Sequence, residues 1–493
     1  MAPRNAHQAM EQVAYKHELP QHLSMMSILG MSFAIMAVPF GLSTTMYITL
    51  TTGQSVSVLW GWVIVSIISL CIAASLAEIC AVYPTAGGTY HWSFLLCTPK
   101  YAPAVSFIDG WLGLVGNWTV CLSITFAGAQ LVLSAISIFN EDFVPNQWQT
   151  VLCFWAVMLV SALVNIFGSR YLDLINKICI YWTALSVVIL MVTLLATADE
   201  KRSASFVFTH YDASASGWPS GWAFFVGLLQ PAYTLTGYGM VPSMCDEVQN
   251  PEREVPKAIV LSVFAAGITG LLYLVPLLFV MPDIEMLLNV ANGQPIGLLF
   301  TTVTRSKAGG FCLLFLILGI LLFAGIGSLT AASRCTYAFA RDGAIPGSQI
   351  WSRVHKKLEV PLNSILLSSA VICLLGCIYF GSLSAFNSFT GVATICLSTS
   401  YCVPIIERYL INGISAVWIF FAVVIFSMPV SLPVDAETMN YASVVFAGFA
   451  AISALWYVVH GRKNFKGPSF GDETSDGVTP DMGTEISGKK DSI

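Results

Sequence analysis

The sequence predicts an all-α membrane protein with twelve transmembrane helices, from its composition, its uncharged runs and the placement of its basic residues. Of 493 residues, 56% are apolar and 10% are charged, whereas a soluble domain carries about 25% charged residues. So little charge cannot coat a soluble surface, and so many apolar residues exclude a disordered chain. The 22 basic and 27 acidic residues form no basic stripe, so nucleic acid is not an expected partner.

Twelve runs have the length of a bilayer-spanning helix, which needs about 20 mostly apolar residues. They are residues 27–50, 57–77, 105–138, 150–167, 178–196, 221–245, 258–281, 311–333, 361–380, 384–406, 411–431 and 440–459. Only the third contains an ionisable group of the Asp, Glu, Lys or Arg type, Asp109, close to its beginning. A transmembrane barrel would show segments of about ten residues with alternating polarity, and the first run is too long for a cleavable signal.

Basic residues alternate between the connections. Both tails and the even-numbered connections together carry eighteen Lys and Arg residues, and the odd-numbered connections carry four. The four are Lys201, Arg202, Arg305 and Lys307. This imbalance predicts that both tails, residues 1–26 and 460–493, are cytosolic, and the second tail has the polar composition of a disordered segment. We expect the plasma membrane as the location.

Helix breakers are concentrated in the first and sixth runs. The first contains Val38-Pro39-Phe40-Gly41, and the sixth contains Pro231 and Gly237-Tyr238-Gly239. Breaks five spans apart are typical of two inverted five-helix repeats with a substrate site at the breaks. In a chain of twelve runs, two such repeats would occupy residues 27–406 and leave two additional helices over 411–459. Proline and glycine are also common in membrane helices. The breakers alone therefore do not distinguish a transport site from a purely structural role in the helices.

Three motifs in the even-numbered connections carry a family resemblance. They are YPTAGGTYHW at residues 83–92, DEVQNP at 246–251 and YAFARDGAIP at 337–346. In this order they resemble the amino acid–polyamine–organocation superfamily, in its fungal amino acid/choline/GABA permease branch, over about residues 20–466. The resemblance implies a ten-helix core of the leucine-transporter type, two extra helices and alternating-access transport. The chain departs from relatives in lacking a Gly-x-Gly break in the first run and in a very short connection at residues 408–410.

The central two-thirds of every run lack Asp, Glu, Lys, Arg and His. A cationic substrate group would then rest on backbone carbonyls and aromatic faces, and a carboxylate on helix N-termini. The candidate site residues are Ala37, Pro39, Phe40, Gly41, Thr236, Gly237, Tyr238 and Gly239. By resemblance, Tyr238 takes the place of an aromatic gate. Asn117 and Phe323 are further candidates, with Trp118 and Ser328, and helix packing is the alternative for all four.

Charged residues at the cytosolic ends of the runs are candidates for an inner gate. They are Glu78, Glu247, Arg334 and Arg341, with Asp342 beside them. Ion pairs among them would close the gate, and Glu247 with Arg341 is the favoured pair. Plain solvation at the membrane interface is the alternative.

The sequence thus favours a secondary active transporter of a small nitrogenous solute such as an amino acid, GABA or choline. A carrier of an alkaloid-like metabolite and a nutrient sensor on the same fold are the alternatives. An enzyme would need nucleophiles, metal ligands or paired carboxylates at mid-membrane, which the runs do not supply. No C-x-x-C motif or histidine cluster suggests a metal, and no cofactor is expected. The expected partners are the substrate and the lipid bilayer, and coupling to a proton stays open.

Overall fold

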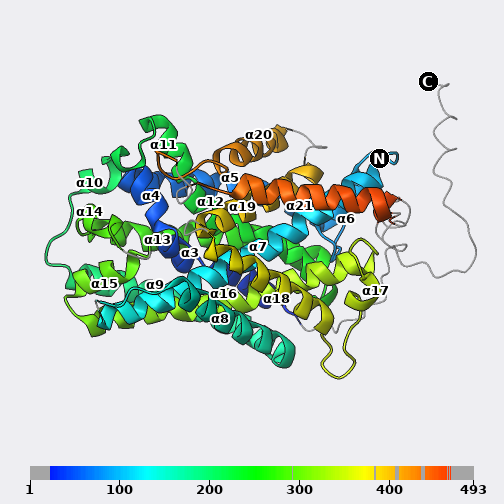
Figure 1. Ribbon diagram of the computed structural model, residues 1–493, viewed down its shortest axis with the longest axis horizontal. Helices are drawn as coiled ribbons and strands as arrows, with labels where there is room; N and C mark the ends of the chain where they lie inside the picture. Colours follow the sequence, from blue (N-terminus) through cyan, green and yellow to red (C-terminus); the bar gives the residue numbers. More distant parts are fainter. Residues whose placement is uncertain are drawn as a thin grey trace, which may run out of the picture. The chain divides into compact units, whose positions relative to one another are not determined.

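The computed structural model describes residues 23–140, 142–290, 293–381, 385–405, 410–434 and 439–462, with Phe465 and Gly467. Over these residues the chain is helical, with two isolated β-bridges and no strand (Figure 1). The helices of the predicted runs are α2 (Met25–Met36), α3 (Val38–Thr44), α4 (Met46–Thr52), α5 (Gln54–Val82), α7 (Ala102–Phe139), α8 (Gln147–Phe167), α9 (Leu172–Thr197), α11 (Ser220–Gly227), α12 (Leu229–Leu235), η3 (Thr236–Glu247), α13 (Pro251–Phe279), α16 (Lys307–Arg341), α18 (Leu362–Gly376), η4 (Cys377–Phe380), α19 (Ala385–Ile405), α20 (Leu410–Ile425), α21 (Ala442–Trp456) and η5 (Tyr457–Gly461). The connections contain α6 (Thr89–Leu96), η1 (Ser169–Tyr171), α10 (Ala204–Thr209), η2 (Ser214–Ser216), α14 (Ile284–Leu288), α15 (Ile296–Thr304) and α17 (Ser348–Trp351).

Ten helical segments among the described residues are long and apolar enough to cross a membrane. The predicted runs 221–245 and 411–431 are the two without such a segment. The first divides into α11, α12 and the 3-10 helix η3, and the second gives the 16-residue helix α20. The short connection at residues 408–410 lies largely outside the described residues.

The break in the first run lies at a single residue. Ala37 adopts a left-handed conformation with φ 42° and ψ 49°, and its N–H closes α2 by donating to Phe33 O at 2.9 Å. Pro39 stands in the first turn of α3, where its missing N–H leaves no helical hydrogen bond unmade. The prediction that Val38-Pro39-Phe40-Gly41 forms the break was therefore wrong, because these residues start the next helix.

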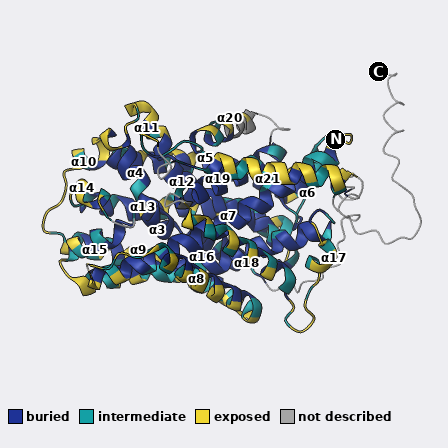
Figure 2. Ribbon diagram, viewed as in Figure 1, coloured by how far each residue is buried: buried dark blue, intermediate teal, exposed yellow. Residues whose placement is uncertain are grey.

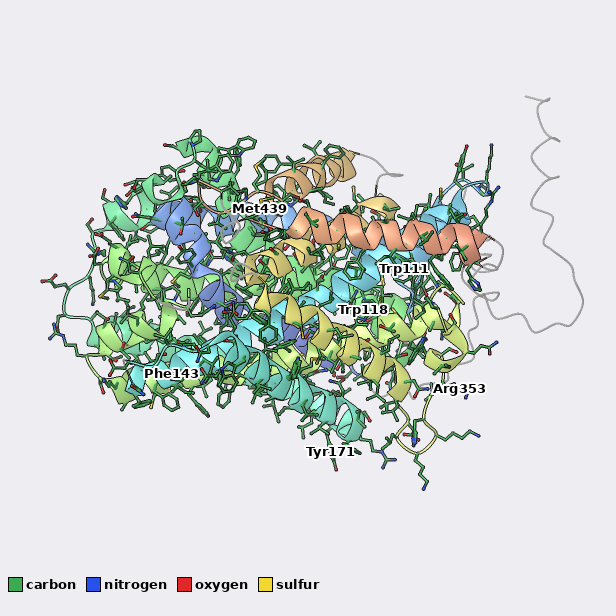
Figure 3. All side chains as sticks on the ribbon, viewed as in Figure 1. Trp111, Trp118, Phe143, Tyr171, Arg353 and Met439 are labelled. Carbon is green, nitrogen blue, oxygen red and sulfur yellow. The ribbon has the colours of Figure 1, made fainter. Side chains whose placement is uncertain are left out.

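Successive connections lie at opposite ends of the helical bundle. In Figure 1, α10, α14 and α15 lie at one end and α6 and α17 at the other. Figure 3 places Phe143 of the third connection with the first group, and Tyr171 and Arg353 of the fourth and eighth connections at the opposite end. The connection that follows α13 contains the five-residue helix α14. An alternating arrangement of this kind is what a chain that repeatedly crosses a membrane requires.

Burial separates the helices into a core and a perimeter. Figure 2 shows α7 and α19 mainly buried, whereas α8 and α21 have long exposed edges. The exposed edges are apolar: Leu159 of α8 is 59% and Leu455 of α21 68% exposed, and on neighbouring helices Tyr181 is 70% and Phe420 80% exposed. Apolar surface of this extent is rare on soluble proteins and suits contact with lipid, where helices satisfy their own backbone groups. The protein is an integral membrane protein.

Candidate functional site

The helical segments that flank the breaks of the first and sixth runs pack against each other. A Cβ on Gly41 of α3 would lie 2.9 Å from Thr234 Cγ2 in α12. A Cβ on Gly237 of η3 would lie 2.4 Å from Ile35 Cγ2 in α2. Since only glycine leaves room for such approaches, these two glycines allow the broken helices to meet. The structure thus places Ala37, Gly41 and Gly237 in one region.

Tyr401 of α19 encloses the other side of this region. Its hydroxyl donates to Thr236 O at 2.9 Å, and a Cβ on Gly239 would lie 2.3 Å from its ring. The Tyr238 and Tyr401 rings are 5.5 Å apart between centroids, and Tyr238 is 3% exposed. Sequence reasoning missed Tyr401, because nothing in its own segment marks it. Its role emerges only when α19 is packed against η3.

Pro39 and Phe40 are buried with their carbonyls already engaged. Ser43 Oγ donates to Pro39 O at 2.5 Å, and Thr44 Oγ1 donates to Phe40 O at 3.0 Å. Such bonds from a hydroxyl to a carbonyl one turn back are typical of Ser and Thr inside helices. The backbone acceptors near the break are therefore held by hydroxyl donors in this conformation.

Asn117 of α7 presents a buried acceptor. Its Nδ2 donates to Gly113 O at 2.7 Å, while its Oδ1 is enclosed and receives no hydrogen bond from the described residues. Because buried polar atoms are almost always hydrogen-bonded, this oxygen is a candidate to accept a hydrogen bond from a ligand.

The three other residues considered with Asn117 have more ordinary surroundings. Trp118 donates to Thr336 and Ser368 and so fastens α7 to α16 and α18. The Ser328 hydroxyl donates to Gly325 O within its own helix, and Phe323 of α16 is only half-buried. Helix packing explains the position of Trp118.

Three hydrogen bonds from two residues of α12 join this helix to its neighbours near the break. Tyr233 Oη donates to Ser123 Oγ of α7 at 2.8 Å. Gln230 Nε2 donates to Leu42 O of α3 at 2.8 Å, and its Oε1 accepts from Thr49 Oγ1 of α4 at 2.9 Å. Sequence reasoning missed these residues, although polar side chains inside an apolar run were a signal that could have found them.

A cavity of about 370 Å³ opens among α3, α7, η4 and the segment before α15. Its polar lining includes Thr44, Tyr47, Gln130, Thr150, Gln294 and Tyr379, and all its described lining residues are neutral. Gln294 crosses it, donating to Thr44 O and to Gln130 Oε1 at 3.3 and 3.2 Å. The cavity therefore offers hydroxyl, amide and aromatic groups to a solute, but no charge.

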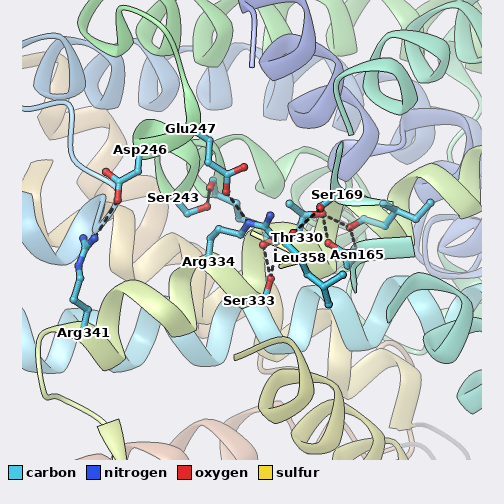
Figure 4. Close-up of polar contacts among 12 residues, drawn as sticks. Asn165, Ser169, Ser243, Asp246, Glu247, Thr330, Ser333, Arg334, Arg341 and Leu358 are labelled. Carbon is cyan, nitrogen blue, oxygen red and sulfur yellow. Dashed lines mark hydrogen bonds and ion pairs between the residues drawn. The ribbon is translucent and has the colours of Figure 1, made fainter. Parts of the chain in front are cut away.

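Two ion pairs join η3 to α16 (Figure 4). Glu247 Oε1 lies 2.9 Å from Arg334 Nε, and these side chains are 8% and 3% exposed. Asp246 Oδ2 lies 3.2 Å from Arg341 Nη1, with exposures of 15% and 17%. The predicted pair of Glu247 with Arg341 was wrong. Arg334 and Arg341 lie on the same face of α16, about 10 Å apart along its axis. At the end of η3, Glu247 pairs with Arg334 and Asp246 pairs with Arg341.

The remaining charged candidates lie elsewhere. Glu78 is exposed at the end of α5. Asp342 is buried and accepts hydrogen bonds from Tyr90 Oη at 2.8 Å and from His91 Nε2 at 3.0 Å. Asp342 therefore fastens α6 to the end of α16. No cluster of three metal-ligating side chains was found among the described residues.

Comparison with known proteins places these features in a family. A family model described as amino acid permease matches residues 23–450. The polyamine transporter TPO5 of Saccharomyces cerevisiae is 34% identical, over 90% of this chain and 76% of that protein. The choline transporter of the same yeast is 32% identical, over 91% and 83% of the two chains. The amino-acid permease BAT1 of Arabidopsis thaliana is 30% identical, over 93% and 95%. The resemblance to the amino acid–polyamine–organocation superfamily is thereby confirmed, and the chain belongs to the amino acid permease family.

Proposed function

We propose that the protein is a secondary active transporter of small nitrogenous solutes that works by alternating access. The observation that carries this proposal is the direct packing of two broken helices, through Gly41 and Gly237, inside an apolar helical bundle. Non-helical backbone at membrane depth is tolerated only where protein or a water-filled cavity satisfies it. The relatives named for amino acids, polyamines and choline share a nitrogenous substrate.

The proposed architecture has twelve spans. Residues 27–406 form two inverted five-helix repeats, and residues 411–459 add two helices. The broken run 221–245 supplies the sixth span, since α11, α12 and η3 together contain 27 residues, enough to cross about 30 Å of hydrocarbon. We propose that both tails are cytosolic, because of the distribution of basic residues, and that the protein lies in the plasma membrane.

In the proposed binding mode, the substrate is held by backbone carbonyls that accept hydrogen bonds from side-chain hydroxyls in this conformation. In this proposal, the carbonyls of Pro39, Phe40 and Thr236 exchange their hydroxyl donors for the substrate ammonium group, and Asn117 Oδ1 accepts a further hydrogen bond. The faces of Tyr238 and Tyr401 contribute cation–π attraction, worth up to about 2 kcal/mol in a desolvated site. A substrate carboxylate would meet the first turn of α3, whose N–H groups carry partial positive charge.

The polar contacts around the break serve as gates. On the side of the neutral cavity, the bond from Tyr233 to Ser123 joins α12 to α7. On the opposite side, the pairs Glu247–Arg334 and Asp246–Arg341 join η3 to α16. Access from one side requires that one set of contacts breaks while the other holds, which is the essence of alternating access.

Uptake by the purified protein in proteoliposomes tests the proposal. The panel contains labelled γ-aminobutyrate, choline, putrescine and several amino acids, each with and without a proton gradient. We expect saturable uptake of at least one of them and none of a labelled sugar. Binding without uptake would instead identify a sensor. The absence of both binding and uptake would refute the proposal for these solutes.

A further inference from the structure

One carboxyl group is enclosed within a membrane-spanning helix and takes no part in either gate. Asp109 of α7 is 0% exposed. Ser93 Oγ of α6 lies 2.5 Å from its Oδ2, and its Oδ1 is buried without a hydrogen bond from the described residues. An ionised carboxylate offers about four acceptor positions, so most of them would go unsatisfied here.

The single hydroxyl proton of Ser93 indicates which protonation state of Asp109 completes the hydrogen bonds at this site. Ser93 Oγ lies within hydrogen-bond distance of both Asp109 Oδ2 and Thr89 O, which is 2.9 Å away. A hydroxyl has a single proton to donate, so it cannot supply both bonds fully. If the Asp109 carboxyl is protonated, it donates to Ser93 Oγ, and Ser93 donates to Thr89 O. Both bonds are then complete.

Among the described residues, no side chain that acts on Asp109 carries a positive charge. The titratable side chains that interact with it are the thiols of Cys335 in α16 and Cys402 in α19, and the Ser400 hydroxyl of α19 lies beside it. The nearest cationic candidate on α6, His91, is instead bonded to Asp342. Burial of an unpaired charge is costly and is normally avoided by neutralisation.

Hydroxyl groups lead from Asp109 toward the helix breaks. Asn117 lies eight residues further along α7, about 12 Å along the helix axis. Between them, a Cβ on Gly113 would lie 3.4 Å from Ser400 Oγ, which is 2.8 Å from Thr89 Oγ1. These hydroxyls lie on the α7 face between the carboxyl and the candidate substrate site.

We propose that Asp109 is the proton-binding site that couples transport to a proton gradient. Asp109 holds a proton on Oδ2 while the pairs between η3 and α16 close the cytosolic side. When these pairs break, water enters and the O–H bond of the carboxyl dissociates, so the proton passes to that water and the carboxylate remains. The proton thus moves inward with the solute. This inference depends on the proposed transport function.

The variant Asp109→Asn keeps the shape of the protonated carboxyl but cannot release a proton. The matched control is Asp142→Asn, at an exposed aspartate. The first measurement needs no transport: infrared spectra of the purified protein at neutral pH. We expect a protonated-carboxyl C=O band in wild type and in Asp142→Asn that disappears in Asp109→Asn. In Ser93→Ala this band should shift to higher frequency, because the carboxyl loses its hydrogen-bond partner.

The second measurement uses labelled γ-aminobutyrate and putrescine in proteoliposomes. In Asp109→Asn, accumulation driven by an inward proton gradient should fall at least tenfold, while exchange without a gradient stays within twofold of wild type. If the band persists in Asp109→Asn, or if this variant keeps its gradient-driven accumulation, the inference about Asp109 is overturned. Neither result would contradict the proposed transport function. Wild type that moves no solute in any condition refutes the proposed function, and the infrared band still decides whether Asp109 holds a proton.

Discussion

The pair of Glu247 with Arg334 gives the sharpest quantitative prediction. Both side chains are almost fully buried, at 8% and 3% exposure, and their atoms are 2.9 Å apart. Removing one partner of a buried pair leaves an uncompensated charge, which costs about 3–5 kcal/mol. If the pair exists only while the cytosolic side is closed, Arg334→Met destabilises that closed state by this amount. At 1.4 kcal/mol per factor of ten, the ratio of closed to open molecules falls at least about a hundredfold.

The native Cys245 can report the opening without an introduced cysteine, because it is two residues from Glu247 and only 2% exposed. We expect its rate of labelling by a small membrane-permeant thiol reagent to rise by about a hundredfold or more in Arg334→Met and in Glu247→Gln, up to the rate of a fully open molecule. The double variant should return near the wild-type rate, because replacing a whole buried pair by uncharged groups is often nearly neutral. The readout is mass spectrometry of the peptide that contains Cys245.

The exposed pair of Lys177 with Asp173 supplies the matched control. Its side chains are 40% and 30% exposed, and exposed pairs contribute about 0–1 kcal/mol. Lys177→Met should therefore leave Cys245 labelling within a few-fold of wild type. Additive effects of the two single substitutions at Glu247 and Arg334 would show that the residues are not energetically coupled, and the gating argument would fail.

Three further predictions address the helix breaks and the topology. Gly41→Ala should lose about 1–3 kcal/mol of stability from overpacking against Thr234, as measured by thermal unfolding in detergent, and Thr234→Ala in the same chain should recover most of it. If Tyr238 contributes its π face, Tyr238→Phe should retain substrate affinity while Tyr238→Ala weakens it by about 1–2 kcal/mol; equal losses in both would assign the effect to the hydroxyl. In intact cells, a cysteine at Ser214 should react with an impermeant reagent and one at Ser352 should not, and the reverse pattern would invert the topology.

Much of the fold was predictable because hydropathy is a local property. Whether a segment contacts lipid depends on its own composition, so helices were recognisable without knowledge of their neighbours. The break in the first run was found only approximately, because Pro39 marks both a helix interruption and a favoured first turn. The left-handed conformation of Ala37 resolves that ambiguity.

The pairing of side chains was not predictable in this way. Arg334 and Arg341 are seven residues apart, nearly two full turns, and so lie on one face of α16. The sequence therefore could not say which of them meets Glu247, and the choice depends on how far η3 extends along α16. Tyr401 beside Tyr238 is a similar case, because their contact depends on the rotation of α19.

The sequence by itself determined the class of protein, the family and the two segments in which helices break. These follow from composition, short motifs and backbone propensities, all of which act over a few residues. Only the tertiary structure decided which breaks touch, which charges pair and which carboxyl is isolated. Those outcomes depend on the rotation and axial position of helices, where a shift of one residue turns a side chain by about 100° and moves it 1.5 Å. Asp109 shows the difference: in the sequence it is one acid at the start of an apolar run, and in the fold it is a fully enclosed carboxyl with a serine as its hydrogen-bond partner.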